Sequence, residues 1–379
     1  MCVTVNDLEY VRRSLAELRP DQGDHPGLPM IESSLTQLEQ CALRVLGRIG
    51  PQMQNALQKV MFHLAWSPES LPTTQAIVPL LEYLDNHLSA LNAALLARNF
   101  SRALSIVWSA VLAGLSGQTD VGGGDGERPA VYHDRLHDAL NLLAEFFHAG
   151  GQGLCDEDLK TEVYRRVEQR LCYHRTDTEG LIDLFHCNRL ADQMAAIAQG
   201  AQCAVPYGVL GVRAYFNHDS LCVEVLHARD VIPLDPNGYS DPFVIIELLP
   251  RRVFAHCGEQ HTNVHKKTLN PIFDECFEFS VTLDQCRSEG AMVAFTVMDH
   301  DVLTANDFAG EAFLALGNIP GVADGSSSVE NFHGLKHVDL PLMHQHDKQN
   351  PILQILESRT GDRMAIEFVK KQKLRFSSA

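Results

Sequence analysis

The first two hundred residues repeat their apolar positions with the period of an α-helix. In three stretches, apolar residues follow one another at spacings of three and four, which places them on one face of a helix. These stripes are Leu81, Leu84, Leu88, Leu91 and Leu95; Leu104, Val107, Val111 and Leu115; and Leu136, Leu140, Leu143 and Phe147. Thr176 with Glu179 predicts a capping box that opens a further helix. The pattern predicts a helical domain over residues 1–204.

Near Val205 the period changes from helical to alternating, which is typical of half-buried β-strands. The expected strands are Val209–Phe216, Leu221–Leu226, Phe243–Leu249, Gln260–Lys266, Phe273–Val281, Met292–Met298, Ala312–Leu316 and His337–Leu342. Eight short strands separated by turn residues predict an antiparallel β-sandwich over residues 205–345. Residues 346–379 return to helical character as a short extension. The expected fold class is therefore multidomain, α plus all-β.

Composition and charge exclude several classes of protein. The net charge of −17 argues against nucleic-acid binding, which depends on a basic surface. The ten cysteines form no CxxC pair, so reduced intracellular thiols are expected rather than a zinc site. Residues 1–7 lack the basic and apolar regions of a signal peptide, and the apolar stretch from Leu104 to Leu115 is too short to span a bilayer. We expect a cytoplasmic protein that meets membranes peripherally.

Five aspartates on two loops carry the candidate chemistry. Asp235 and Asp241 lie on the first loop, and Asp299, Asp301 and Asp307 lie on the second. Both loops follow strand-like runs, and loops at one end of a sandwich are neighbours in space. Carboxylates that converge repel one another unless a cation lies between them, and Ca²⁺ accepts six to eight oxygen ligands. Mg²⁺ suits this set less well, while a solvated acidic loop pair and a weak metal site stay open as alternatives.

These loops resemble those of a C2 domain. The resemblance spans about residues 206–345 and is carried by Leu221–Val225, Leu234–Phe243, Lys266–Glu275 and Asp299–Glu311. A strand ahead of Leu221 resembles the strand order of synaptotagmin-type C2 domains. The resemblance implies that Asp235, Asp241, Asp299, Asp301 and Asp307 are the five calcium ligands of such a domain.

The helical part resembles the second Munc homology domain of the Unc-thirteen vesicle-priming family. The resemblance rests on residues 80–85, 95–100 and 146–154. A helical (MUN-type) region followed by a C-terminal C2 domain is that family's arrangement, and the C2 loops are most similar to the branch of brain-specific angiogenesis inhibitor-associated protein three. The resemblance implies regulated exocytosis, dense-core vesicle or endosomal traffic and SNARE proteins as partners. Long family members carry further helices and another C2 domain, so this sequence is expected to be a fragment, a short isoform or an incomplete gene prediction.

The predicted membrane contacts surround the aspartates. Val302 and Leu303 are the first candidates to enter the lipid interface, and Leu234 and Tyr239 are secondary; ordinary loop packing is the alternative. A basic face that binds anionic phospholipids, phosphatidylserine or phosphoinositides, is expected on neighbouring strands, with a solvated strand face as its alternative. Its residues are Arg251, Arg252, His265, Lys266 and Lys267. Calcium loading is expected to cancel the loop charge, so that these groups can approach the vesicle, the late or recycling endosome or the plasma membrane.

Catalysis is not expected. The helical part contains no G-x-S-x-G, Walker, kinase or H-E-x-x-H motif, and the 18 histidines are dispersed. His344 and His346 are interpreted as part of a solvated loop. A calcium-independent trafficking scaffold with a purely structural C2 domain remains the alternative function.

Overall fold

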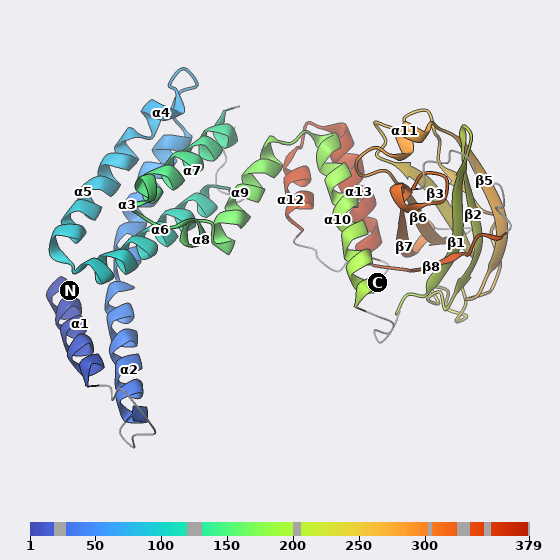
Figure 1. The fold of residues 1–379 in the computed structure, drawn as a ribbon. Coiled ribbons are helices and arrows are strands. Elements are labelled where there is room, and N and C mark those ends of the chain that lie inside the picture. Colours follow the sequence, from blue (N-terminus) through green and yellow to red (C-terminus); the bar gives the residue numbers. More distant parts are fainter. Residues whose placement is uncertain are drawn as a thin grey trace. The chain divides into compact units, whose positions relative to one another are not determined.

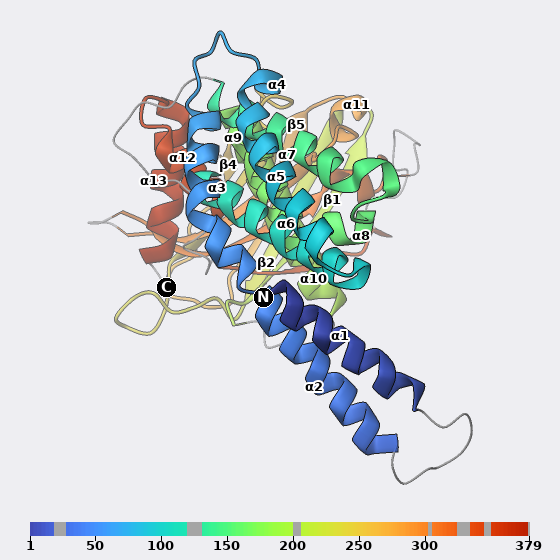
Figure 2. The ribbon, with the colours of Figure 1, turned by 90° about the vertical axis from the view of Figure 1, so that its left-hand side faces the viewer.

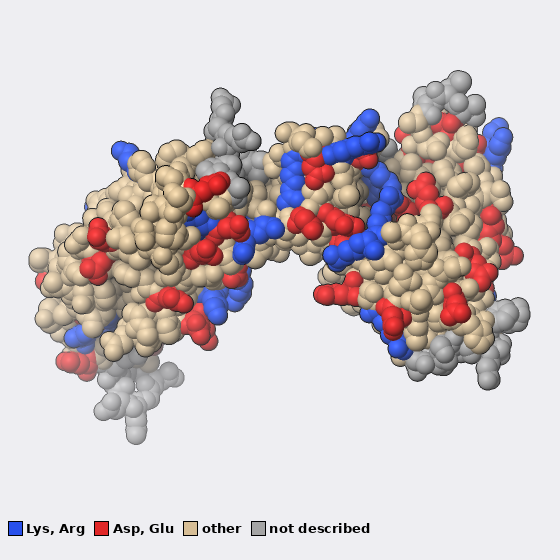
Figure 3. Space-filling model, turned by 90° about the horizontal axis from the view of Figure 1, so that it is seen from above, with Lys and Arg blue, Asp and Glu red and all other residues tan. Residues whose placement is uncertain are grey.

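The computed structural model describes residues 1–18, 28–119, 131–199, 206–301, 305–323, 334–344 and 350–377. The chain divides into two compact units, Met1–Thr176 and Asp177–Ala379 (Figure 1). On the face shown in Figure 3, acidic and basic side chains are interspersed on both units.

The first unit is entirely helical in its described residues. Its elements are α1 (Cys2–Glu17), α2 (Leu28–Leu46), α3 (Ile49–Ala65), α4 (Thr73–Ala76), α5 (Val78–Ala94), α6 (Ala97–Thr119), α7 (Tyr132–His148), the 3₁₀ turn η1 (Ala149–Gly151), α8 (Asp156–Leu159) and α9 (Glu162–Arg175). Figure 2 shows α1 and α2 lying side by side. The two predicted stripes on α6 and α7 are fully buried, because they face one common core.

Helix α6 is the central element of this core. Trp108 is 1% exposed, and its indole Nε1 donates a hydrogen bond to the carbonyl of Leu159 at 2.9 Å. With 23 residues, α6 is long and apolar enough to cross a membrane by length and composition alone. The expectation that this apolar segment is too short to span a bilayer was therefore wrong in its length, because the helix extends beyond Leu104 and Leu115 on both sides. Half of its most apolar 18-residue stretch is buried within the first unit.

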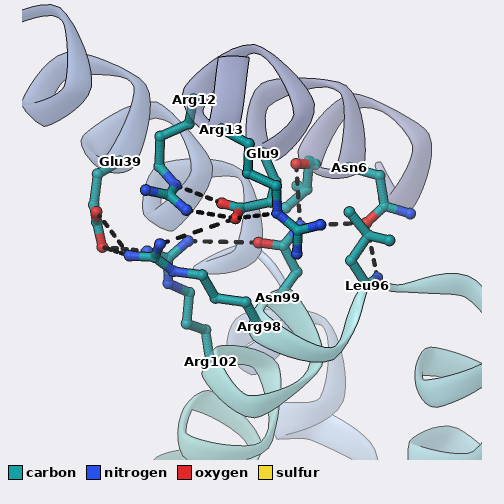
Figure 4. A network of polar contacts seen from close by, with 10 residues as sticks. Asn6, Glu9, Arg12, Arg13, Glu39, Leu96, Arg98, Asn99 and Arg102 are labelled. Atoms are coloured by element: carbon teal, nitrogen blue, oxygen red, sulfur yellow. Dashed lines mark hydrogen bonds and ion pairs between the residues drawn. The ribbon is translucent and has the colours of Figure 1, made fainter. Parts of the chain in front are cut away.

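A polar network ties α1 to α2 and α6 (Figure 4). The Glu9 carboxylate is 2% exposed and accepts hydrogen bonds from Arg12 at 2.7 and 2.8 Å and from Arg13 at 3.2 Å. Arg98 lies 3.9 Å from Glu9 and 3.3 Å from Glu39. The hydrogen bond from Arg12 and the surrounding positive charge lower the pKa of Glu9 to about 2.

We expect acid to weaken the first unit through Glu9. A carboxylate with a folded pKa of about 2, against 4.5 when unperturbed, stabilises the fold above pH 4.5, and this contribution is lost as the pH falls towards 2. Glu9→Gln should remove on the order of 2 kcal/mol at neutral pH and flatten this pH dependence; we set the loss below the full shift because Arg13 and Arg98 are partly exposed.

The test is urea unfolding followed by tryptophan fluorescence, because both tryptophans, Trp66 and Trp108, belong to the first unit. Glu145→Gln, at an exposed position on α7, is the matched control and should change little. Equal stabilities and equal pH profiles for Glu9→Gln and the parent would contradict the prediction.

The second unit begins with α10 (Thr178–Ala198) and continues into two four-stranded antiparallel sheets. The strands are β1 (Val209–Asn217), β2 (Ser220–Arg229), β3 (Pro242–Leu249), β4 (Gln260–His261), β5 (Ile272–Ser280), β6 (Met292–Asp299), β7 (Asp307–Ala315) and β8 (Val338–Pro341). The sheets have the orders β5-β2-β1-β8 and β4-β3-β6-β7. Short elements α11 (Leu283–Cys286) and η2 (Leu316–Asn318) join strands, and α12 (Pro351–Ser358) and α13 (Arg363–Ser377) follow. The predicted fold class is confirmed.

Alternate side chains of the strands point between the sheets and form one core. Its largest fully buried members include Phe216, Phe254 and Phe295, with Val212, Val223 and Val244 around them. Two predicted strands were wrong by five residues at one end, whereas the other bounds lie within three residues of the prediction. β4 has two residues rather than seven, and β7 begins at Asp307, five residues earlier than expected, because it pairs with β6 as far as Asp299.

Helix α10, which its period groups with the preceding helices, packs on the sandwich. The first unit ends at Thr176, whereas the helical domain was expected to extend to residue 204. The Gln193 side chain pairs with Phe313 of β7 in both directions, donating to the carbonyl at 2.6 Å and accepting from the amide at 2.8 Å. The expected capping box is wrong: Asp177 caps α10 by accepting from the Gly180 amide, while Thr176 ends α9.

A buried ion-pair network joins α10 and α13 to β7. Glu311 of β7 is 3% exposed; it accepts a hydrogen bond from Arg189 Nε of α10 at 2.8 Å and another from Arg375 of α13. Arg375 also donates to Thr296 Oγ1 at 3.3 Å and lies 5.1 Å from the ring centroid of Phe308. Burial alone would raise the pKa of Glu311, but Arg375 and Arg189 hold it below its usual value. Glu311 is therefore a buried carboxylate whose charge depends on two helices outside the sheets.

Candidate functional site

The strand register brings the loop aspartates to one end of the sheet that contains β3, β6 and β7. Asp299 is the last residue of β6; it is opposite Pro242 of β3 on one side and opposite Asp307 of β7 on the other. Asp241 directly precedes β3, so its loop and the β6–β7 loop leave the sheet side by side. The structure thus places Asp241, Asp299 and Asp307 on three adjacent strand ends.

The β2–β3 loop is held in a defined turn. The Asp235 amide donates to the Tyr239 carbonyl, and the Gly238 amide donates to the Asp235 carbonyl, both at 3.0 Å. Gly238 has a φ of +81°, which glycine adopts without strain. Ser240, fully buried, donates to the Ile232 carbonyl at 2.8 Å and accepts from the Leu234 amide at 3.0 Å. This turn fixes the positions of Asp235 and Asp241 on the loop.

The two loops contact each other through Asp299, which is 2% exposed. Its Oδ1 accepts a hydrogen bond from the Asp241 amide at 2.6 Å, and the His300 amide donates to the Asp241 carbonyl at 3.0 Å. Burial raises the pKa of Asp299, and the negative charges of Asp235, Asp301 and Asp241 raise it further. The carboxylates are therefore near enough to repel one another electrostatically.

The donor set is suited to a hard cation, because every candidate ligand is a carboxylate. Other contacts orient the set: the Lys267 amide donates to Asp241 Oδ1 at 2.7 Å, and the Asp301 amide donates to Asn306 Oδ1 at 3.1 Å. Asn306 is a supporting residue that the sequence analysis missed. In the described ranges, which omit residues 302–304 of this loop, no three His, Cys, Asp or Glu side chains are grouped closely enough to hold a metal ion.

The predicted membrane contacts differ from one another in their environment. Tyr239 is 49% exposed at the tip of the β2–β3 turn, as a membrane contact requires. Leu234 packs partly buried against the sandwich core, which favours the alternative of loop packing for this residue. Val302 and Leu303 lie outside the described residues.

The five residues of the expected basic face do not form one surface. Lys266 and Lys267 lie beside Asp241, and the neighbouring His265 amide donates to the Pro242 carbonyl. Arg251 and Arg252 follow the far end of β3. With a rise of about 3.3 Å per residue, the eight residues of β3 separate the two groups by roughly 25 Å.

The two arginines of this expected face are also engaged in ion pairs. Arg251 pairs with Glu247 of β3, and Arg252 Nε lies 3.1 Å from Asp183 Oδ2 of α10. The single-face expectation is corrected accordingly, and Lys266 and Lys267 are the cations that flank the acidic loops.

Comparison with known proteins found a family match for the sandwich and relatives that match nearly the whole chain. Residues 219–333 match the C2 domain family. Over 98% of its length the chain is 38% identical to mouse (Mus musculus) BAI1-associated protein 3, of which it covers 33%. Human (Homo sapiens) protein unc-13 homolog D is 33% identical over the entire chain, which covers 35% of that protein. Synaptotagmin-3 of Rattus norvegicus is 41% identical over 27% of this chain and 16% of its own length. The chain spans about a third of the first two relatives.

Proposed function

Because the chain belongs to the family of BAI1-associated protein 3 and unc-13 homolog D, we propose that it is a calcium-dependent phospholipid-binding protein of vesicle exocytosis. The observation that carries the calcium proposal is the convergence of the acidic loops at Asp299. This buried carboxylate accepts the Asp241 amide and is raised in pKa by burial and by the charges of three other aspartates. Such mutual repulsion is relieved by a divalent cation.

Asp235, Asp241, Asp299, Asp301 and Asp307 would hold the ion. When bound, Ca²⁺ supplies positive charge that offsets the carboxylates of both loops. The hydrogen bonds of Asp241 with Asp299 and His300 keep the two loops in register, and the turn at Gly238 orients Asp235. Drawing the carboxylates together is then a local movement of side chains on strand ends that the sheet already aligns.

The same end of the sandwich would face anionic lipid. Lys266 and Lys267 lie beside the acidic loops, and each basic residue near an anionic membrane contributes about 1 kcal/mol. Tyr239 has the exposed aromatic ring that suits the lipid interface. Without the ion, the five aspartates oppose this approach. Calcium therefore works by removing a charge barrier that the lysines and Tyr239 cannot overcome by themselves.

The helical unit contributes to the proposed cellular role rather than to calcium binding. Its similarity to the same relatives supports a tethering or priming role in SNARE-mediated fusion, on dense-core vesicles, endosomes or the plasma membrane. The same similarity supports a role without catalysis. The partner that the helices bind is proposed to be a SNARE protein.

We expect the full chain to co-sediment with phosphatidylserine-containing liposomes in calcium and to stay in solution in chelator. In the Asp299→Asn/Asp301→Asn variant, calcium-dependent binding to the liposomes should be at least about tenfold weaker than in the parent, because calcium affinity depends on the number of charged ligands. The control variant, Asp284→Asn/Glu289→Gln, removes the same charge near α11, at the opposite end of β6.

Binding that is equal with and without calcium would reject the sensor and favour a calcium-independent scaffold. Equal losses in both variants would mean that general surface charge, rather than the loop site, governs attachment.

A further inference from the structure

A cavity of about 590 Å³ lies within the second unit, between α10, α13 and the outward face of β3, β6 and β7. Leu249, Ala294 and Phe313 of the sheet line it, as do Ile182 of α10 and Met364 and Phe368 of α13. The cavity is partly open to solvent, because its lining includes Arg363, whose side chain is 91% exposed. Its size is within the range of small-molecule sites.

The charges that line the cavity are already matched to one another. Lys371 and Arg251 both pair with Glu247, the first at 3.3 Å. Arg363 pairs with Glu367 at 2.7 Å. The fourth cation, Arg375, pairs with Glu311 in the buried network described above.

Each cation of the lining is thus paired with a carboxylate of the lining. The lining carboxylates outnumber the lining cations by five to four, and among the residues that the structure describes Glu179 has no ion pair. The lining therefore offers no net positive charge to an anion, and the charge pattern favours a neutral ligand.

Three lining residues have a buried side-chain atom without a hydrogen-bond partner: Gln372 Oε1, His186 Nδ1 and Asp183 Oδ2, of which Asp183 is ion-paired with Arg252. Gln372 of α13 is 1% exposed, and its Oε1 has no hydrogen-bond partner. A buried amide oxygen without a donor is unfavourable by about 1–3 kcal/mol. Because Gln372 Oε1 has almost no accessible surface, its side chain must turn toward the cavity to meet a ligand, and a ligand that supplies a donor would stabilise the turned side chain. Burial lowers the pKa of the neighbouring lining residue His186 to about 4, which leaves the imidazole uncharged at neutral pH.

We propose that this cavity binds a small neutral molecule with an apolar body and one hydrogen-bond donor, directed at Gln372. The ligand would contact α10, α13 and the sheet at once and so fasten both helices to the sandwich. The site is separate from the acidic loops and does not rest on the proposed calcium function. Its test is therefore made in the presence of a calcium chelator.

The probe is 1-aminoanthracene, a neutral fluorescent amphiphile with an N–H donor, titrated into the full chain. We expect saturable binding at one site. Ala294→Leu fills the floor of the cavity and should weaken binding at least tenfold, while Ala195→Leu adds the same atoms at an exposed position on α10 and should change nothing. Gln372→Leu should weaken binding about fivefold, the effect of one net hydrogen bond.

Anthracene-1-carboxylate, of similar shape but anionic, should bind at least tenfold more weakly than the neutral probe. Thermal unfolding checks that each variant is folded; if Ala294→Leu is not, Ile182→Phe fills the cavity from α10 instead. The proposal is overturned by a parent chain without saturable binding, by unchanged affinity in the folded cavity-filling variant, or by equal affinity for the anionic probe. Unchanged affinity in Gln372→Leu overturns the assigned donor contact.

Discussion

Glu311→Gln is expected to lower the free energy of unfolding of the second unit by about 3–5 kcal/mol, because it leaves two buried arginines without their carboxylate. The substitution keeps the shape of the side chain and removes the charge that Arg189 and Arg375 share. For a unit of roughly two hundred residues, this loss corresponds to a fall of about 6–20 °C in its melting temperature. Calorimetry on the full chain measures it, while tryptophan fluorescence follows the first unit as an internal reference.

Glu367→Gln on α13 is the matched control, since it breaks an exposed pair with Arg363 one helical turn away. Exposed pairs contribute about 0–1 kcal/mol, so this variant should unfold close to the parent. Similar melting temperatures for Glu311→Gln and Glu367→Gln would show that burial of the network adds nothing to its strength.

Removing the flanking helices is the second change with a large expected effect. A chain of residues 206–345 ends near the expected C2 bounds but lacks α10 and α13, so Glu311 loses both partners and Leu249, Met292, Ala294 and Phe313 lose their cover. We expect it to unfold more than about 10 °C below a chain of residues 177–379 and to aggregate through the exposed sheet face. Circular dichroism and light scattering of the two chains measure the difference.

Glu311→Leu distinguishes the two causes. In the short chain it should raise the melting temperature, because it removes the lone carboxylate from an apolar face; in the longer chain it should lower it, because it leaves two arginines unpaired. If the short and longer chains are equally stable, α10 and α13 are additions to an independent sandwich.

Most of the fold was predictable because its signals are local. Leu104 and Phe147 stripes report one buried face of a helix, and alternation with turn residues reports strands. Element limits were less predictable where pairing decides them: β7 starts at Asp307 because β6 continues to Asp299 opposite it. Helix α10 has the period of any amphipathic helix, and that period does not say whether its face meets other helices or a sheet.

The acidic loops were predictable for a related reason. Asp241, Asp299 and Asp307 occupy strand ends, and neighbouring strands bring these ends together whatever the details of packing. The basic face was not predictable, since closeness in sequence says little across a β-strand. Arg251 follows Leu249 at one end of β3, whereas Lys267 contacts Asp241 at the other.

The buried network was missed altogether. Arg189 and Arg375 are 122 and 64 positions from Glu311, and all three side chains have the appearance of ordinary surface residues in the sequence. Only the tertiary structure shows that a helix before the sandwich and a helix after it bring their cations to one carboxylate.

Glu311 also limits which helix can cover this sheet. An amphipathic helix from elsewhere in the chain, or from a second copy, could match the apolar surface equally well, yet it would trap an unneutralised acid beneath it. Packing of a wrong helix is therefore unfavourable, and stable packing requires a pair of helices with arginines at the positions of Arg189 and Arg375. Glu311 thus makes the packing of helices on this sheet selective. We expect its replacement by an apolar residue to reduce that selectivity even where stability is retained.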